Sequence, residues 1–226
     1  MIKTQLWRIL QLLASRIYRK PIVWFDALNY NALLFDWIRS NSRVPKVSSR
    51  KEVFQHVFRE YVGSKPVDYL EFGVYRGESL RLVCGLNKNQ RSRFFGFDTF
   101  SGLPEDWWPN LPKGAVNAGG LPQIDDSRVK LVRGLFQETL IPFLESFRSN
   151  NRLIVYIDAD LFSSTLFVMS TIYKILGQGD VLILDDFANP VQVFRAFLIF
   201  SKYLSFKHTF KPIYIFRIRR SHYGCL

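Results

Sequence analysis

The spacing of apolar residues changes after the first quarter of the chain. Residues 52–62 place Val53, Phe54, Val57 and Phe58 three or four positions apart, which predicts a helix. Farther on, short runs rich in β-branched and aromatic residues alternate with stretches of helical spacing. The runs are 67–74, 93–98, 129–134, 153–158 and 181–185, and the helical stretches are 77–87, 136–148, 163–176 and 190–203. This alternation predicts an α/β fold, with a doubly wound, mostly parallel sheet covered by helices on both faces.

The last two apolar runs are connected differently from the others. Residues 205–210 and 213–218 are strand-like, and only Lys211 and Pro212 separate them. So short a connection joins antiparallel strands, whereas parallel strands need a longer crossover. We therefore expect a C-terminal antiparallel hairpin, which brings the predicted sheet to seven strands.

The first twenty residues have the pattern of a basic amphipathic helix. Apolar residues recur at helical spacing, and most of the Lys and Arg residues fall on other faces. Arg8 and Arg16 interrupt the apolar run, so it lacks the ~20 apolar residues of a membrane span and the core of a signal peptide. Two interpretations stay open: packing against its own domain or a second copy in a homodimer, and peripheral contact with a membrane.

The net charge of +12 is concentrated at the two ends of the chain. Residues 1–60 carry 11 Lys and Arg against 4 acidic residues, residues 202–226 carry 6 against none, and the stretch between them is nearly neutral. A nucleic-acid binder would carry a basic groove across its fold, so this distribution argues against nucleic acid. We expect an N-terminal basic helical extension over residues 1–60 and one domain over 61–226.

The two cysteines are the basis for an expected location. Cys84 and Cys225 form neither a disulfide framework nor a metal-ligand spacing. We therefore expect a cytoplasmic protein, with membrane contact limited to the N-terminal helix.

A glycine turn lies between the first predicted strand and the next helix, in the sequence Glu71-Phe-Gly-Val-Tyr-Arg-Gly-Glu-Ser79. Glycines at such a junction let a ligand approach the backbone, and free N–H groups at the helix start can bind an anion. A dinucleotide fingerprint would place a glycine at position 75, where this chain has Tyr75. The turn therefore predicts a small-molecule site and disfavours a pyrophosphate.

Acidic residues follow the other predicted strands. Asp98 ends the second strand, where a carboxylate can bind the hydroxyls of a ribose or cap a turn. Asp158 and Asp160 follow the fourth strand, and Asp185 and Asp186 follow the fifth. Because these ends share one edge of a parallel sheet, the unpaired like charges would repel one another. A cation held by Asp158, Asp185 and Asp186 would relieve this, and oxygen ligands favour Mg²⁺ or Mn²⁺. The alternative is that single aspartates cap helices.

Four motifs in order carry a resemblance to a known family. They are residues 71–79, Gly96-Phe-Asp-Thr-Phe-Ser-Gly-Leu-Pro104, Asp158-Ala-Asp-Leu-Phe-Ser-Ser-Thr165 and Leu184-Asp-Asp-Phe187. Together they resemble the macrocin O-methyltransferase family over roughly residues 50–220. The resemblance implies a Rossmann-like class I methyltransferase fold, S-adenosylmethionine as methyl donor, a divalent metal and a sugar hydroxyl as acceptor. Residues 61–226 would then be the methyltransferase domain.

The resemblance also implies roles for individual residues. The methionine part of the donor would lie against Glu71, Gly73, Gly77 and Ser79, the ribose against Asp98, and the adenine against Gly134, Phe136 and Gln137. The metal would be held by Asp158, Asp185 and Asp186. The candidate catalytic residues are Asp158 and Asp160; Asp160 is our candidate for the base, and solvent is the alternative proton acceptor.

The segment 103–120 is rich in Pro and Gly and follows the second strand, which is typical of a lid. Its Trp107 and Trp108 would either stack on an acceptor or anchor the loop. Two other functions stay open at this point. One is a non-catalytic methyltransferase-like module that binds a membrane or an acidic partner through its basic ends. The other is a nucleotide-dependent oxidoreductase, which Tyr75 and the acidic cluster oppose.

Overall fold

The structure, a computed structural model, describes residues 19–41, 49–107, 111–203 and 213–216. Two helices precede the sheet, α2 (Arg19–Ser40) and α3 (Arg50–Val57), and a π-helical turn, η1 (Phe58–Val62), extends α3. The expected amphipathic helix over residues 1–20 lies almost wholly outside the described residues. Within the described residues, no helix combines the length and apolar character needed to cross a membrane.

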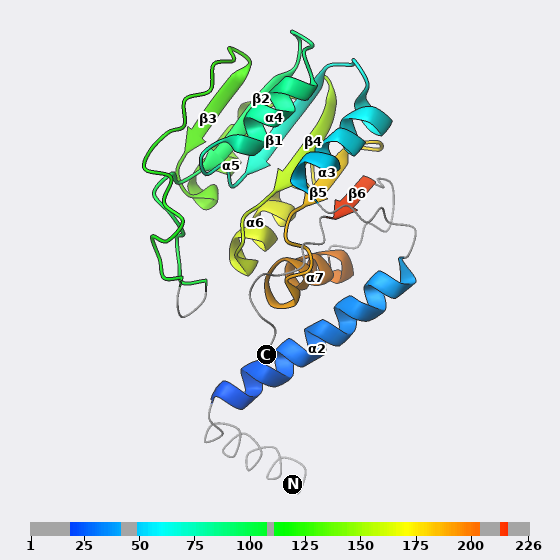
Figure 1. Cartoon of the computed structure of the whole chain (residues 1–226), viewed down its shortest axis with the longest axis vertical. Helices are drawn as coiled ribbons and strands as arrows, with labels where there is room; N and C mark the ends of the chain where they lie inside the picture. The colour runs from blue at the N-terminus through cyan, green and yellow to red at the C-terminus, as the bar shows by residue number, and fades with distance from the viewer. Residues whose placement is uncertain (1–18, 42–48, 108–110, 204–212, 217–226) are drawn as a thin grey trace, which may run out of the picture.

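Strands and helices then alternate, as the apolar spacing predicts (Figure 1). The strands are β1 (Val67–Phe72), β2 (Arg93–Asp98), β3 (Val129–Arg133), β4 (Arg152–Ile157), β5 (Val181–Leu184) and β6 (Ile213–Phe216). The helices are α4 (Glu78–Leu86), α5 (Phe136–Ser146), α6 (Phe162–Ile172), a π-helical turn η2 (Pro190–Phe194) and α7 (Arg195–Tyr203). Each of the five predicted strands is therefore confirmed to within one or two residues at its ends.

The strands form one sheet in the order β3-β2-β1-β4-β5-β6, and every neighbouring pair is parallel. The order reverses between β1 and β4, which is where open α/β sheets bind their ligands. The doubly wound α/β fold is thus confirmed, but the described sheet has six strands rather than seven. The antiparallel hairpin stays a prediction, because residues 205–210, its expected first strand, lie outside the described residues; β6 pairs in parallel with β5.

Both faces of the sheet are buried, which explains why its strands read as continuous apolar runs. Tyr69, Phe94 and Tyr156 point to the face that α3, η1 and α4 cover. Phe72, Phe97 and other alternate residues point to the opposite face, which is covered by α5, α6, η2 and α7 and where α2 also contributes. Side chains of one strand alternate between faces, so each strand serves both cores.

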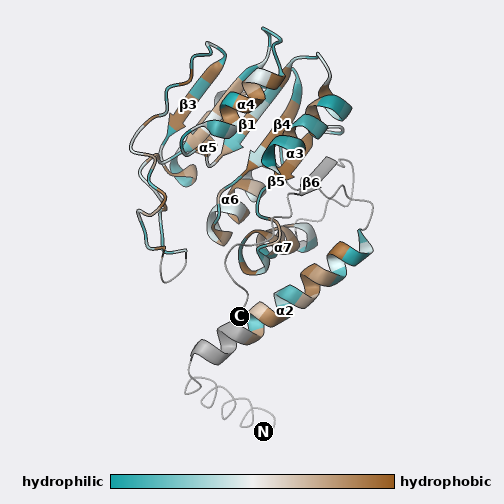
Figure 2. Cartoon of the chain, viewed as in Figure 1, coloured by the Kyte–Doolittle hydropathy of each residue, from teal (hydrophilic) through white to brown (hydrophobic). Residues whose placement is uncertain are grey.

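Helix α2 runs alongside η2 and α7 at one end of the molecule (Figure 1). Leu34 is buried there, and the Trp37 ring packs edge-on against Phe187 with ring centroids 4.9 Å apart. Its other side leaves large apolar side chains in solvent, with Phe25 72% exposed and Phe35 69% exposed. Figure 2 shows brown, apolar residues along this helix.

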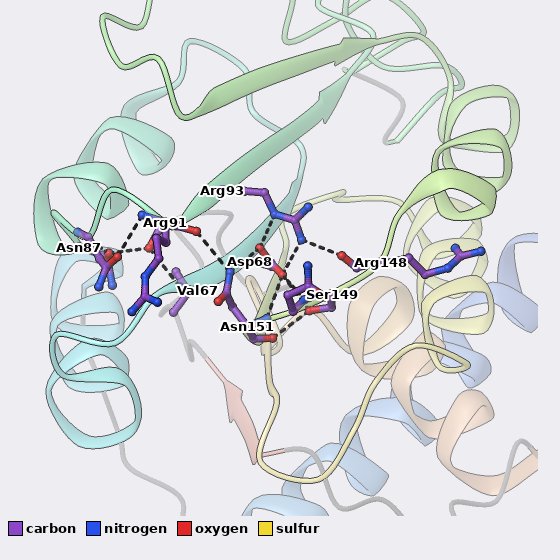
Figure 3. Close-up of polar contacts among 11 residues, drawn as sticks. Val67, Asp68, Asn87, Arg91, Arg93, Arg148, Ser149 and Asn151 are labelled. Atoms are coloured by element: carbon purple, nitrogen blue, oxygen red, sulfur yellow. Dashed lines mark hydrogen bonds and ion pairs between the residues drawn. The ribbon is translucent and has the colours of Figure 1, made fainter.

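A polar cluster joins the amino ends of the strands, opposite the end where ligands are expected (Figure 3). The buried Asp68 of β1 accepts two bonds from Arg93 of β2, at 2.7 and 2.8 Å. It also accepts bonds from Ser149 and Asn151 in the loop before β4. One carboxylate thus joins three neighbouring segments of the sheet.

Candidate functional site

A pocket of about 280 Å³ opens at the carboxyl ends of β1, β2 and β4. Its size lies near the lower end of the ~300–1,000 Å³ typical of ligand sites. The lining comes from the glycine turn, the ends of the strands, the segment after β3, the lid segment 103–120 and the start of α3. It comprises Arg50, Gly73, Val74, Tyr75, Arg76, Glu78, Asp98, Thr99, Gly102, Leu103, Pro104, Trp107, Val116, Leu135, Phe136, Gln137, Asp158, Ala159, Asp160, Ser164 and Asp186.

The glycine turn after β1 needs Gly73 for two reasons. Its backbone has a φ of +93°, which favours glycine, and a Cβ at this position would overlap the backbone carbonyl of Asp158. The close approach brings the ends of β1 and β4 together at the pocket. Gly77, with φ +77°, is the N-cap residue of α4; it is buried and does not line the pocket.

Asp98 shapes this turn with its side chain. Its Oδ2 accepts backbone N–H bonds from Val74 at 2.9 Å and Tyr75 at 2.7 Å, and its Oδ1 accepts one from Phe100 at 2.7 Å. The turn-capping alternative therefore describes this carboxylate well. Because Asp98 also lines the pocket, its role toward a ribose stays a prediction alongside the structural one.

Glu71 and Ser79 lie behind the pocket rather than in its wall. The Glu71 carboxylate is fully buried and accepts bonds from the Ser79 hydroxyl at 2.5 Å and the Tyr69 hydroxyl at 2.7 Å. Burial raises the pKa of Glu71 to about 7, against the opposing effect of these two donors. The arrangement is that of an enclosed structural carboxylate, and contact of Glu71 or Ser79 with a ligand stays a prediction.

The segment after β3 reaches the pocket through Leu135, Phe136 and Gln137. Gly134 does not line the pocket, and its N–H donates instead to the backbone carbonyl of Asp98 at 3.0 Å. Phe136 packs edge-on against Phe72 of β1, with ring centroids 5.5 Å apart. An apolar ring beside an amide side chain is suited to binding an adenine. Contact of Phe136 and Gln137 with the adenine stays a prediction.

The lid segment lies against the pocket through Leu103, Pro104, Trp107 and Val116. Its two arms bond to each other, from the Leu103 N–H to the Ala115 carbonyl at 2.8 Å. The Trp107 indole N–H is buried and has no hydrogen-bond partner among the described residues. Trp108 lies outside the described residues. Trp107 therefore lines the pocket and has an indole N–H that could donate a hydrogen bond to a ligand oxygen.

The aspartates meet as the strand order predicts, but a basic residue lies among them. Nη2 of Arg50 donates to Oδ2 of Asp158 at 2.6 Å and to Oδ2 of Asp185 at 2.9 Å. The Tyr156 hydroxyl donates to the same two oxygens, at 3.2 and 2.8 Å. Burial lowers the pKa of Arg50, but Asp158, Tyr156 and Asp185 together raise it by more. The pKa of Arg50 thus lies above its ordinary value. Arg50 is therefore charged at any physiological pH.

This arrangement does not fit the expected metal site. Among the described residues, no group of three or more His, Cys, Asp or Glu side chains could hold a metal ion. The Oδ2 atoms of Asp158 and Asp185 already accept bonds from Arg50 and Tyr156. Repulsion between unpaired aspartates predicts a metal, and an arginine of the chain itself offsets part of that repulsion. Burial, followed by the nearby Asp185, still raises the pKa of Asp158 well above its usual value, against the effect of Arg50.

Asp160 and Asp186 face the pocket from the ends of β4 and β5. Both have a left-handed backbone, with φ of +57° and +44°, which is uncommon for residues other than glycine. Burial, followed by the nearby Asp186 and Asp185, raises the pKa of Asp160 to about 7. Such strain and such a pKa are typical of functional sites.

Arg50 is the site residue that sequence reasoning missed. It precedes the four motifs and belongs to a segment predicted only as helix, so nothing local distinguishes it from other surface arginines. Tyr156 likewise stands out in the sequence only as part of a predicted apolar strand. The signal that could have drawn attention to them is the acidic cluster itself, which requires a positive charge from some source.

Comparison with known proteins supports the resemblance. Residues 121–214 match the model of the macrocin-O-methyltransferase family, TylF. This range includes the two aspartate motifs and not the glycine turn. No curated protein matches the sequence.

Solved structures with the same fold include two methyltransferases. CalS11, a calicheamicin methyltransferase, is 21% identical, with a TM-score of 0.54 and 70% of each chain covered. The O-methyltransferase NovP is 20% identical, with a TM-score of 0.51, 70% of this chain covered and 71% of the other. A second CalS11 structure, described as a TDP-rhamnose 3'-O-methyltransferase, is 20% identical with a TM-score of 0.50, covering 80% of this chain and 86% of the other. These similarities show the class I methyltransferase fold.

Proposed function

We propose that this chain, an O-methyltransferase whose residues 121–214 match the macrocin O-methyltransferase family, transfers a methyl group from S-adenosylmethionine to a hydroxyl of a sugar or sugar-bearing metabolite. The observation that carries the proposal is the pocket at the carboxyl ends of β1, β2 and β4 in a chain with this family match. The sugar acceptor rests on the family match and on the similarity to CalS11, a TDP-rhamnose 3'-O-methyltransferase.

The donor would lie along the glycine turn. Gly73 would let its methionine part approach the backbone, Asp98 would bind the ribose, and Phe136 with Gln137 would flank the adenine. The exposed Glu78, at the first position of α4, is a further carboxylate that lines the pocket and could bind the ammonium group. Glu71 would support the turn from behind instead of touching the donor.

The sulfonium of the donor is already an electrophile, so the protein has to align an acceptor oxygen with the methyl group and remove its proton. Alignment alone can account for much of the acceleration. Asp160 is the candidate base, because it lines the pocket and its pKa of about 7 suits proton transfer near neutral pH. Trp107 would cover the acceptor from the lid.

Divalent metal assistance, which the resemblance implies, is not part of this proposal. Arg50 already contacts the carboxylates of Asp158 and Asp185 that would bind the ion. Neither alternative function is favoured. The methyltransferase match opposes an oxidoreductase, and a formed pocket opposes a purely non-catalytic module.

Thermal shift with S-adenosylhomocysteine or NAD tests the donor. We expect stabilisation by S-adenosylhomocysteine only, and Asp98→Asn should weaken its binding about tenfold, which corresponds to about 1.4 kcal/mol. The exposed Asp125 gives a matched control, since Asp125→Asn should leave the shift unchanged. Transfer of labelled methyl groups to nucleotide-linked sugars, free sugars and phenols then tests the acceptor. Stabilisation by NAD alone would contradict the proposal.

A further inference from the structure

Arg50 contacts both aspartates with one nitrogen. Its Nη2 lies 2.6 Å from Oδ2 of Asp158 and 2.9 Å from Oδ2 of Asp185, so it bridges carboxylates that follow two neighbouring strands. The Asp185 side chain is fully buried and that of Asp158 is 16% exposed. A guanidinium remains charged and donates bonds in a fixed plane, which makes it well suited to bridging carboxylates.

The position of Arg50 is set by a rigid element. It is the first residue of α3, and the Ser49 side chain caps this helix by accepting the Glu52 N–H at 3.2 Å. The helix is anchored in the core by the fully buried Phe54, whose ring packs edge-on against Tyr156 at 4.9 Å. The backbone of Arg50 is therefore held in place by α3, and its side chain reaches the aspartates from there.

A divalent ion that bridged the two carboxylates through their Oδ2 atoms would need the place that Arg50 occupies. Mg²⁺ binds carboxylates at about 2.0–2.1 Å in near-octahedral geometry, whereas the bridging position between the two Oδ2 atoms holds Nη2 of Arg50. The Tyr156 hydroxyl donates to both oxygens as well, and it would have to turn away. An ion could bind between these two atoms only after Arg50 moved, which would remove both aspartate partners from a partly buried guanidinium.

We propose that Arg50 takes the place of a divalent cation between Asp158 and Asp185, so that methyl transfer by this chain needs no metal. In this role Arg50 is a positioning residue: it holds the two carboxylates, and through them the strand ends that present Asp160 to the pocket. The part of this inference that concerns catalysis rests on the proposed methyltransferase function. The part that concerns the cation does not.

Direct binding of Mn²⁺, measured by electron paramagnetic resonance on the full chain, tests the cation without any assay of activity. We expect the wild type to show no Mn²⁺ site that depends on Asp158 at millimolar Mn²⁺. A stoichiometric site in the wild type that Asp158→Asn abolishes would overturn the proposal. This measurement needs no acceptor, so it decides the point even if no methyl transfer is found.

Removal of the guanidinium should expose the pair to metal. Arg50→Met retains much of the side-chain volume and should gain a Mn²⁺ site, which Arg50→Met combined with Asp158→Asn should lose. Failure of a folded Arg50→Met to bind Mn²⁺ would contradict the inference that Arg50 substitutes for an ion. Arg59→Met is the matched control, because Arg59 is exposed and pairs only with Glu60 among the described residues, and it should gain no site.

Activity with chelator and with added Mg²⁺ tests the catalytic part. Wild-type turnover should be unchanged by EDTA, and Arg50→Met should lose on the order of 10²-fold in kcat while S-adenosylhomocysteine still binds. Mg²⁺ should restore part of this loss, and Arg50→Lys should retain more activity than Arg50→Met. Loss of wild-type activity in EDTA with recovery in Mg²⁺, or full activity of Arg50→Met without metal, would overturn the proposal. If Arg50→Met does not fold, the comparison of wild type with Arg50→Lys in EDTA still decides it.

Discussion

Among single residues, Asp160 is the strongest candidate for a chemical role in the pocket. Its backbone is left-handed, and it lines the pocket directly after β4. The charged groups around it are Asp185 and Asp186 after β5, Arg50 on α3 and Asp98 at the end of β2. Burial and the two aspartates after β5 raise its pKa, while Arg50 opposes this rise, and the result of about 7 places its titration near neutral pH.

Asp160→Asn should therefore lower kcat by about 10²–10⁴-fold, the usual effect of removing a general base. In the wild type, activity should rise with pH through about 7, because only the deprotonated carboxylate accepts a proton. This rise should be absent from the variant. The measurement is a pH–rate profile with saturating donor, and an unchanged profile in the variant would show that another group takes the proton.

The protonation of the buried Glu71 carboxyl group affects the free energy of unfolding. Its pKa is about 7 in the folded protein against an ordinary value of 4.5, so the folded state binds the proton more tightly than the unfolded state. The stabilisation of the folded state that comes from this tighter proton binding is complete below pH 4.5 and is lost as the pH rises to about 7. At higher pH a buried charge remains, supported by Ser79 and Tyr69.

Glu71→Gln should remove this pH dependence. Relative to the variant, the wild type should lose up to about 3 kcal/mol in free energy of unfolding between pH 4.5 and 8. Urea denaturation at several pH values measures the difference. Glu145→Gln, at an exposed position, should show none. A constant difference across this range would mean that Glu71 does not titrate there.

At the scale of elements, the two ends of the sheet have separate roles. The carboxyl ends hold the pocket, whereas the amino ends are joined by Asp68 and its partners (Figure 3). Burial is the largest single effect on Asp68 and raises its pKa, but the bonds that Arg93, Asn151 and Ser149 donate together outweigh it, so the pKa lies below its ordinary value. A depressed pKa means that its contribution to stability is present above pH 3.8 and is lost as the pH falls through the folded value.

Asp68→Asn should cost about 2–4 kcal/mol in free energy of unfolding at pH 7, because it removes a buried charge from its partners. The cost should shrink at acidic pH, where Asp68 itself becomes protonated. Asp36→Asn is the control: the Asp36 side chain is 64% exposed in its pair with Arg39, so its loss should cost about 0–1 kcal/mol. Equal losses for the two variants would contradict the role of Asp68.

For the whole molecule, the position of α3 matters most. The sequence predicts a helical extension over residues 1–60, and that division stays a prediction. However, Val53, Phe54 and Val57 of α3 lie in the same buried cluster as the sheet residues Tyr69 and Tyr156. The last part of the expected extension is thus integral to the domain that carries the pocket.

Phe54→Ala tests this integration. Because Phe54 is fully buried, its truncation should cost about 3–5 kcal/mol in free energy of unfolding. Phe25→Ala on α2 should change stability by no more than about 0.5 kcal/mol, since that ring is 72% exposed. Denaturant unfolding measures both. A small effect of Phe54→Ala would show that α3 is a dispensable extension after all.

Much of the fold was accessible from the sequence because apolar spacing reports local geometry. The five strands from β1 to β5, the crossovers and the turn at Gly73 follow from residues within a few positions of one another. The direction of β6 was not accessible in this way. The short Lys211-Pro212 connection predicts an antiparallel hairpin, which stays a prediction because residues 205–210 lie outside the described residues, and no local pattern indicates the parallel pairing of Ile213–Phe216 with β5.

The sequence by itself determined that carboxylates gather at one edge of a parallel sheet, because each follows its own strand. Only the tertiary structure decided which positive charge lies among them. Arg50 is 108 residues from Asp158 and 135 from Asp185, and no local pattern connects positions so far apart. Packing of α3 on the sheet brings the guanidinium to the aspartates, and the same packing of strand and helix encloses Glu71 behind the pocket.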